Sequence, residues 1–365
     1  MIITKEKRNL AVAGLLIGVI AVLLVLLGNP KNMGFCLACF IRDIAGGVKL
    51  HTAAPVQYIR PEIIGLILGS FIISLATREF RARGGSSPVL RFIIGAMVMI
   101  GALAFLGCPF RLILRLSAGD LNALIGLLGF ASGIGVGSFF LAKGFSLGKT
   151  QKQSSLEGAA LPAVNVVLLA LVAFIPALFA FSAKGPGSMH APILVSLAAG
   201  LAVGILAQRT RMCMAGGFRD MYLLKDGTLI TGFIALFVAA LVMNLVTGNF
   251  NPGFKNQPVA HSAHIWNFLG MVVCGLGSVM LGGCPLRQLI LAGEGNSDSA
   301  VTVLGLLTGA AFAHNFGLAG SGDSVVDGVY KVGGLSTNGK VAVIACLIIL
   351  VCVACVKTFA KKKES

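Results

Sequence analysis

The chain has 365 residues, of which 56% are hydrophobic and 12% are charged, about half the usual charged fraction. This composition excludes an ordinary soluble protein, because the apolar residues form runs comparable with the roughly 20 residues that cross a bilayer. The formal net charge of +16 does not indicate nucleic-acid binding, since the lysines and arginines lie between the apolar runs, as the positive-inside rule predicts. We therefore expect an all-α polytopic integral membrane protein, with the lipid bilayer and no nucleic acid among its partners.

The first apolar run follows Lys5, Lys7 and Arg8. It is longer than the apolar core of a signal peptide and no cleavage motif follows it, so we interpret it as an uncleaved span. With nine later runs it predicts about ten transmembrane helices, at residues 10–28, 62–76, 89–107, 121–142, 161–182, 192–208, 228–247, 264–281, 299–316 and 340–356. Glycines at helix-packing spacing predict close helix contacts, at Gly14/Gly18, Gly65/Gly69, Gly129/Gly133/Gly137 and Gly200/Gly204.

The distribution of positive charge predicts the orientation of these helices. If the N-terminus is cytoplasmic, the inner segments hold 19 lysines and arginines and the outer segments hold 10. The positive-inside rule then places both termini, with the basic tail Lys361–Lys363, in the cytoplasm. The expected location is the cell (inner) membrane, crossed many times.

Two motifs recur along the chain. The segment GFCLACFIRD at 34–43 matches RMCMAGGFRD at 211–220 without a gap, so that Cys36 maps onto Cys213, 177 residues later. GCPFR at 107–111 matches GCPLR at 283–287 with an offset of 176. Both offsets span five predicted helices, an odd number, which predicts two halves in an inverted-topology repeat.

The repeat suggests a division of the chain into four parts. Residues 1–142 form a first membrane repeat, and residues 191–316 form the inverted second one. Residues 143–190 are a linker with a connecting span, and residues 317–365 hold an outer loop, the final span and a basic cytoplasmic tail.

The GCP-x-R motifs predict anion-binding helix ends. Proline favours the first turn of a helix, so Cys108 and Cys284 are expected at the N-caps of short helices, with Arg111 and Arg287 in their first turns. Backbone amides, the positive end of the helix dipole and a guanidinium would then converge beside each sulfur. An anion could be held there.

The other two repeated cysteines, Cys36 and Cys213, also lie on short segments between spans. Each is followed by an Arg-Asp pair, Arg42-Asp43 or Arg219-Asp220, for which a structural ion pair and a ligand contact are equally open. If all four short helices re-enter the membrane, the four sulfurs would cluster near its midplane. We name all eight residues as substrate-binding candidates: Cys36, Cys108, Cys284, Cys213, Arg111, Arg287, Arg42 and Arg219.

The other cysteines, and the two histidines of one loop, are expected to have ordinary structural roles. Buried free cysteine is often a small apolar residue, and this is our prediction for those inside spans, Cys274, Cys346, Cys352 and Cys355. Cys36 and Cys39 form a C-x-x-C pair, a redox or zinc signal, but the second copy has Gly216 in place of the second cysteine. We therefore predict no metal and no cofactor. His261 and His264 are expected in a solvated polar loop.

Together, GFCLACFIRD, the two GCP-x-R segments and TRMCMAGGFRD resemble the YeeE/YedE family of sulfur-compound transporters, and in particular its selenium-metabolism-associated YedE branch. The resemblance covers residues from about 10 to 356. It implies an all-helical fold with an inverted repeat and short helices meeting in an hourglass-like interior, and thiosulfate import through cysteines. It also implies that Cys36, Cys108 and Cys284 contact the substrate, and that a small cytosolic sulfur-carrier protein is a possible partner. Cys213 is added by the internal repeat.

We predict a transporter or channel, not an enzyme, that imports a thiosulfate-like or selenium-containing anion through a pore with thiols and helix N-termini as soft relay sites. The main alternative is a membrane-embedded sulfur or selenium transferase with a nucleophilic cysteine. A second alternative is a binding or assembly subunit without flux of its own.

Overall fold

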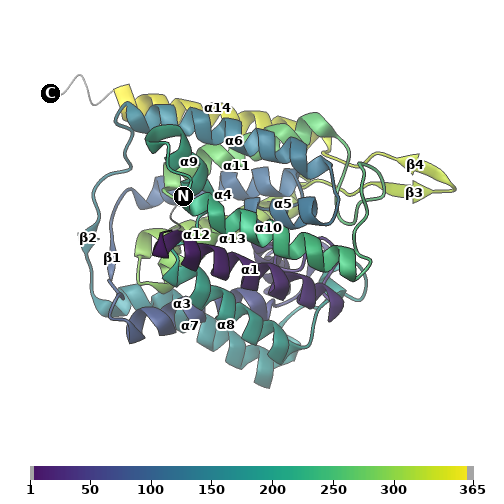
Figure 1. Cartoon of the computed structure of the whole chain (residues 1–365), viewed down its shortest axis with the longest axis horizontal. Coiled ribbons are helices and arrows are strands. Elements are labelled where there is room, and N and C mark those ends of the chain that lie inside the picture. Colours follow the sequence, from purple (N-terminus) through teal and green to yellow (C-terminus); the bar gives the residue numbers. More distant parts are fainter. Residues whose placement is uncertain (1–3, 360–365) are drawn as a thin grey trace.

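The computed structural model describes residues 4–359, and the predicted basic tail Lys361–Lys363 lies outside the described residues. The fold is helical apart from two small antiparallel ribbons (Figure 1), which confirms the predicted all-α membrane architecture. The long helices are α1 (Lys5–Leu26), α3 (Pro61–Ala76), α4 (Pro88–Ala104), α6 (Asn122–Ala142), α7 (Ser155–Phe174), α8 (Ile193–Arg209), α10 (Thr228–Val246), α11 (His264–Leu281), α13 (Ser297–Asn315) and α14 (Thr337–Phe359).

Four short helices lie between the long ones: α2 (Leu37–Gly47), α5 (Pro109–Ser117), α9 (Met214–Leu224) and α12 (Pro285–Gly293). The 3-10 helices are η1 (Ala54–Val56), η2 (Pro176–Leu178) and η3 (Pro186–Ser188). Strand β1 (Arg83–Gly84) pairs with β2 (Gln151–Lys152), and β3 (Ser324–Val326) pairs with β4 (Val329–Lys331).

Nine helical segments of the described chain are long and apolar enough to cross a membrane. They contain all the long helices except α13, which matches the tenth predicted span and has 19 residues. Polar side chains such as Asp298 and Thr302 make α13 less apolar, and both are buried against the rest of the bundle. The protein is therefore a multi-pass membrane protein, in which α13 turns its polar side chains toward the bundle and exposes apolar ones such as Leu304 and Phe312.

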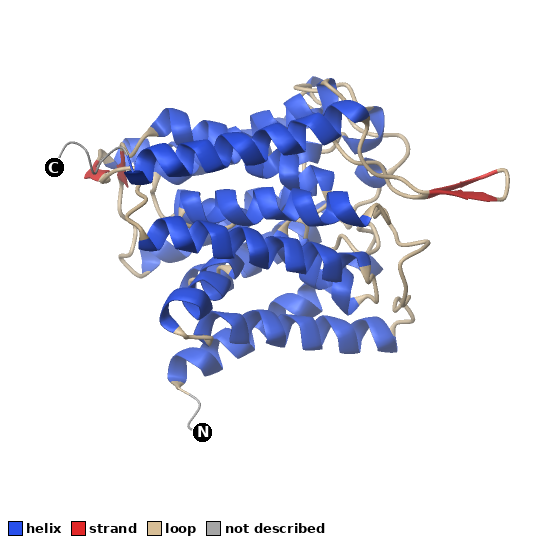
Figure 2. Ribbon diagram, turned by 90° about the horizontal axis from the view of Figure 1, so that it is seen from above, coloured by secondary structure: helices blue, strands red, loops and turns tan. Residues whose placement is uncertain are grey.

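The two ends of the bundle differ. Helix α1 begins and α14 ends at the end that carries β1 and β2, whereas the β3–β4 hairpin projects from the opposite end (Figures 1 and 2). The short helices α2 and α5 follow long helices that finish at the hairpin end. The short helices α9 and α12 follow long helices that finish at the other end (Figure 1).

The prediction for α7 was wrong by about two turns. The sequence suggested a span at 161–182, but the helix runs from Ser155 to Phe174. It starts earlier because the Ser154 side chain accepts a hydrogen bond from the Glu157 N–H, an N-cap of the usual kind. It ends earlier because Ile175 precedes Pro176, and a residue before proline is disfavoured in the helical conformation.

Glycine-mediated contacts hold the long helices together in pairs, and this prediction is confirmed. Helix α1 packs against α10, α3 against α8, α4 against α13, and α6 against α11. A Cβ added at Gly14 would collide with the carbonyl of Gly232, and one added at Gly204 would collide with that of Leu66. Small residues of this kind let two backbones approach closely where lipid provides no hydrophobic driving force.

Candidate functional site

A cysteine occupies the N-cap position of each short helix, with Cys36 before α2, Cys108 before α5, Cys213 before α9 and Cys284 before α12. Pro109 and Pro285 start the helices that follow Cys108 and Cys284, as predicted from the preference of proline for the first turn. All four sulfurs are buried and free. The positive ends of four helix dipoles therefore lie beside four thiols in the interior of the protein.

The thiols of the second half form one close pair. The Sγ atoms of Cys213 and Cys284 are 3.9 Å apart, and the Cys213 sulfur accepts a hydrogen bond from the Gly216 N–H at 3.2 Å. The Cys284 side chain makes no capping hydrogen bond to α12. The thiol contact thus joins the N-termini of α9 and α12.

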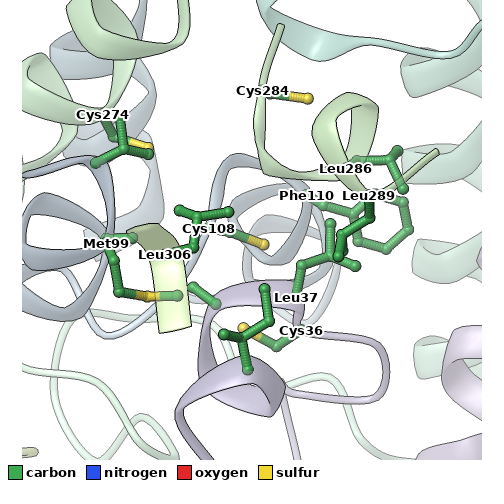
Figure 3. Close-up of a cluster of buried hydrophobic side chains, with 14 of the residues drawn as sticks. Cys36, Leu37, Met99, Cys108, Phe110, Cys274, Cys284, Leu286, Leu289 and Leu306 are labelled. Carbon is green, nitrogen blue, oxygen red and sulfur yellow. The ribbon is translucent and has the colours of Figure 1, made fainter. Parts of the chain in front are cut away.

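The thiols of the first half form the equivalent pair. Cys36 and Cys108 lie close together in Figure 3. The Cys36 sulfur accepts the Cys39 N–H at 3.4 Å, and the Cys108 sulfur accepts the Arg111 N–H at 3.5 Å.

The contacts of these thiols join them as two pairs, and all four cysteines belong to one buried hydrophobic core. The pairing follows from the topology, because the two cysteines of each pair cap short helices that enter from the same end of the bundle. Phe110, Leu286 and Leu289 pack in the same buried core, with Cys284 on a separate short helix from Cys36 and Cys108 (Figure 3). Two polar thiol sites therefore share one apolar interior.

Arg111 is fully buried. Its Nε donates to the carbonyl of Asn32 at 2.8 Å, its Nη2 donates to that of Val259 at 3.1 Å, and its Nη1 bonds the Leu106 carbonyl and the Cys39 sulfur. Within the described residues it forms no ion pair with a carboxylate. Its charge therefore stays uncompensated beside Cys36 and Cys108, which favours an anion nearby.

Arg42, the next candidate, belongs to a buried ion-pair network. Its Nη2 is 2.7 Å from Asp43 Oδ1, and the second oxygen of Asp43 is 2.8 Å from Arg60 Nε. Arg60 also donates to the carbonyls of Pro186 and Met189. We did not predict Arg60, although an arginine directly before an apolar run is a signal for a buried ion pair.

The two arginines of the second half are less buried. Arg219 Nη2 lies 2.7 Å from Asp220 Oδ1, with a third of its side chain exposed. Arg287 Nη1 lies 3.1 Å from Glu294 Oε1, and its side chain is 15% exposed. Each of the four candidate arginines therefore has protein partners, and only Arg111 among them lacks a carboxylate within the described chain.

A second buried arginine was missed. Arg115, one turn after Arg111 on α5, bonds Asp120 Oδ2 at 2.6 Å and lies over the ring of Phe105, 4.1 Å from its centre. Its signal was present in the sequence, because Arg115 is the only other charge in the short segment after GCPFR before Asp120. It fixes the C-terminal turn of α5 and so orients the helix that Cys108 caps.

The predictions for the cysteines inside spans and for His261 have different outcomes. The cysteines of the ordinary spans lie within α11 and α14, where Cys274 and Cys346 are buried, Cys355 is half-buried and Cys352 is exposed. The expected solvated loop is wrong for His261, which is buried with Nε2 2.8 Å from the Ala104 carbonyl. The turn after α4 has free carbonyls in the interior, and the histidine satisfies one of them.

The fold and the interior site define a multi-pass membrane protein with thiols at helix N-termini. A family model described as "Sulphur transport" matches residues 2–108 and 209–365. The chain belongs to this sulphur-transport family, which confirms the predicted resemblance.

Two curated relatives are both named thiosulfate transporter TsuA. The thiosulfate transporter TsuA of Escherichia coli (strain K12) is 34% identical over 108 residues, which are 29% of this chain and 30% of that protein. The thiosulfate transporter TsuA of Spirochaeta thermophila is 35% identical over 103 residues, which are 28% of this chain and 31% of that protein. The aligned part thus spans less than a third of either relative. Both are named as transporters and not as enzymes.

Proposed function

We propose that this protein carries a small sulfur- or selenium-containing anion of the thiosulfate type across the membrane, with cysteine thiols as its contact points. The observation that carries the proposal is the pairing of the thiols, with Cys213 and Cys284 at 3.9 Å and Cys36 near Cys108 (Figure 3). Each pair lies where two helix N-termini meet. The family membership and the names of the two relatives support the same class of substrate.

The chemistry of the two thiol pairs suits a transient contact. A thiol is a weak donor and a soft, polarizable partner for sulfur or selenium, so it holds such an anion without trapping it. Helix N-termini offset the cost of bringing negative charge into the membrane. Arg111 adds a fixed positive charge, and Arg42, through Asp43 and Arg60, holds the helix that Cys36 caps.

The two pairs would act in succession within an inverted repeat. We propose that residues 1–142 and 191–316 are the two repeats, with residues 143–190 linking them and residues 317–365 closing the bundle. The pairing of long helices supports this, because the packing of α1 on α10 corresponds to that of α8 on α3 under the 177-residue offset. An anion would pass from one pair to the other through the apolar centre.

The proposal also covers the orientation of the protein in the membrane and a soluble partner protein. The charge distribution favours the cell (inner) membrane with both termini in the cytoplasm, so the Cys213–Cys284 pair would face the cytoplasm. A small sulfur-carrier protein at the cytoplasmic end of the transport pathway could receive the anion.

The test is uptake into liposomes by the purified protein, across a panel of sulfur and selenium anions. Thiosulfate or a selenium anion should enter, and Cys108→Ala or Cys284→Ala should abolish its entry in folded protein. Cys274→Ala is the matched control, because Cys274 is a buried thiol within the long helix α11 and caps no short helix, and it should keep most of the flux. Equal flux in all three variants would rule out the thiol contacts.

The same samples distinguish transport from transferase chemistry. A nucleophilic cysteine would accumulate a covalent adduct of fixed mass after incubation with the anion. We expect intact-mass spectrometry to find no such adduct on the wild-type protein.

A further inference from the structure

A cavity of about 240 Å³ opens at the end of the bundle where α1 begins. It has an excess of positive charge, because arginines outnumber carboxylates in its wall by two. The lining residues are Glu79, Arg81, Arg83, Arg211, Arg287 and Glu294. None of the thiols lines this cavity, so it is distinct from the site described above.

Both carboxylates of the cavity already have partners. Glu79 accepts hydrogen bonds from Arg209 at 3.0 Å and from Gln208 at 2.8 Å. Glu294 accepts from Arg287 at 3.1 Å. In the described part of the chain Arg81, Arg83 and Arg211 have no carboxylate within ion-pair distance. Three guanidinium groups at the rim are therefore available to an anion.

The backbone holds these arginines in place. The N–H of Arg81 donates to the Glu294 carbonyl at 2.9 Å, and the N–H of Arg83 donates to the Gly295 carbonyl at 3.2 Å. Arg211 has a φ of 53°, in the left-handed region where glycine is the usual residue. The rim is thus built from ordered backbone.

The cavity leads toward the second thiol pair. Arg287 lies in the first turn of α12, three residues after Cys284, and Arg211 precedes Cys213 by two residues. The Arg287 guanidinium acts electrostatically on the Cys213 thiol. Arg287 is the most buried of the four arginines, whereas the other three are exposed. Positive charge therefore extends from the rim down to the thiols.

We propose that this cavity is a separate binding site for a small oxyanion, adjoining the Cys213–Cys284 pair. Guanidinium groups bind two oxygens of such an anion at once, and several of them around one cavity raise its local concentration. The inference rests on the proposed function, because it assigns the anion that the thiols contact. A lipid phosphate offers the same oxygens, so the source of the oxyanion has to be tested.

The experiment compares Arg81→Gln/Arg83→Gln with a control that removes the same charge from the same end of the bundle. The control is Lys143→Gln/Lys357→Gln, because Lys143 follows α6 and Lys357 lies in the last turn of α14, away from the cavity. Thiosulfate flux is measured in vesicles that hold the protein in one orientation, with and without anionic lipid. Thiosulfate binding by the detergent-solubilised protein is measured in parallel.

Arg81→Gln/Arg83→Gln should raise the half-saturating thiosulfate concentration about fivefold when the anion is supplied at the cavity side. The half-saturating concentration on the opposite side and the maximal flux should stay unchanged. The effect should shrink at high ionic strength, since salt screens exposed charges. The lysine control should behave as wild type.

Equal half-saturation in both double variants would overturn the site. A difference seen only in vesicles that contain anionic lipid would assign the cavity to lipid phosphates and also overturn it. If the wild-type protein shows no flux, the proposed function fails by itself. In that case, weaker thiosulfate binding by the arginine variant than by the control still supports the cavity, and equal binding overturns it.

Discussion

The Sγ atoms of Cys213 and Cys284 lie 3.9 Å apart, although 71 residues separate the two cysteines in the sequence. Each caps a short helix that follows a long one finishing at the same end of the bundle. The contact therefore joins two helix N-termini through their thiols, and it places the positive ends of both dipoles at one point.

A mild oxidant such as diamide should link Cys213 and Cys284. The sulfurs need to move about 2 Å closer to reach the length of a disulfide bond. The two thiols give up two protons and two electrons, which diamide accepts. The bond should block anion flux, and dithiothreitol should restore it. Peptide mass spectrometry identifies the bond, with Cys284→Ser as the variant that cannot form it. A bond between Cys108 and Cys284 in its place would contradict the two-pair arrangement.

Arg111→Gln should destabilise the protein strongly. The change leaves the buried carbonyls of Asn32 and Val259 without their donor, and unsatisfied buried groups of this kind cost about 3 kcal/mol together. The repeat-equivalent Arg287→Gln should cost about 1 kcal/mol or less, because it removes one partly exposed ion pair with Glu294. The free energy of unfolding in detergent gives both values, and equal losses would show that the Arg111 contacts contribute no more than those of Arg287.

Gly133→Ala should weaken the contact between α6 and α11. A Cβ at Gly133 would collide with the Val272 carbonyl, so the two helices must separate, at a cost of about 1–3 kcal/mol. Gly135 is the control on the same helix, since a Cβ there meets no atom closer than 3.7 Å. Gly135→Ala should be neutral or slightly stabilising, because alanine favours helix over glycine. Thermal unfolding of the two variants measures the difference, and a lower melting temperature for Gly135→Ala would refute it.

The β3–β4 hairpin should lose stability in acid. Burial raises the pKa of Asp323, but hydrogen bonds from the Tyr330 hydroxyl and from the N–H groups of Gly333 and Ser262 outweigh it and hold this pKa below its ordinary range. A carboxyl with a lowered pKa stabilises the fold above its unfolded value of about 4. That stability is lost as the pH falls through the folded pKa.

Hydrogen-exchange protection factors of residues 324–331 check this expectation. They should hold from neutral pH to about 4 and then fall. Asp323→Asn should lower them at neutral pH and remove most of the pH dependence, while amides inside α6 keep their protection. A hairpin that is equally protected at every pH in both proteins would be inconsistent with a stabilising role for the Asp323 carboxylate.

The long helices and the starts of the short ones could be predicted from local sequence. Apolar runs of bilayer length define α1, α10 and α14, because hydropathy and length alone decide whether a segment crosses a membrane. The proline after Cys108 and Cys284 predicts the first turn of α5 and α12, since its fixed φ suits that position. The glycines of α6 and α8 predicted close helix contacts for the same local reason. The start of α7 also had a local signal, in Ser154 and Glu157, which we overlooked.

Only the tertiary structure decided which groups meet in the interior. The sequence contains four similar cysteines, but their division into Cys36 with Cys108 and Cys213 with Cys284 depends on which ends of the bundle the short helices enter. The Arg111 guanidinium bonds the carbonyl of Val259, and His261 bonds that of Ala104, across more than 140 residues of chain. Local patterns cannot report such contacts, because the free energy of a buried hydrogen bond depends on partners that the chain brings together only when all its helices have packed.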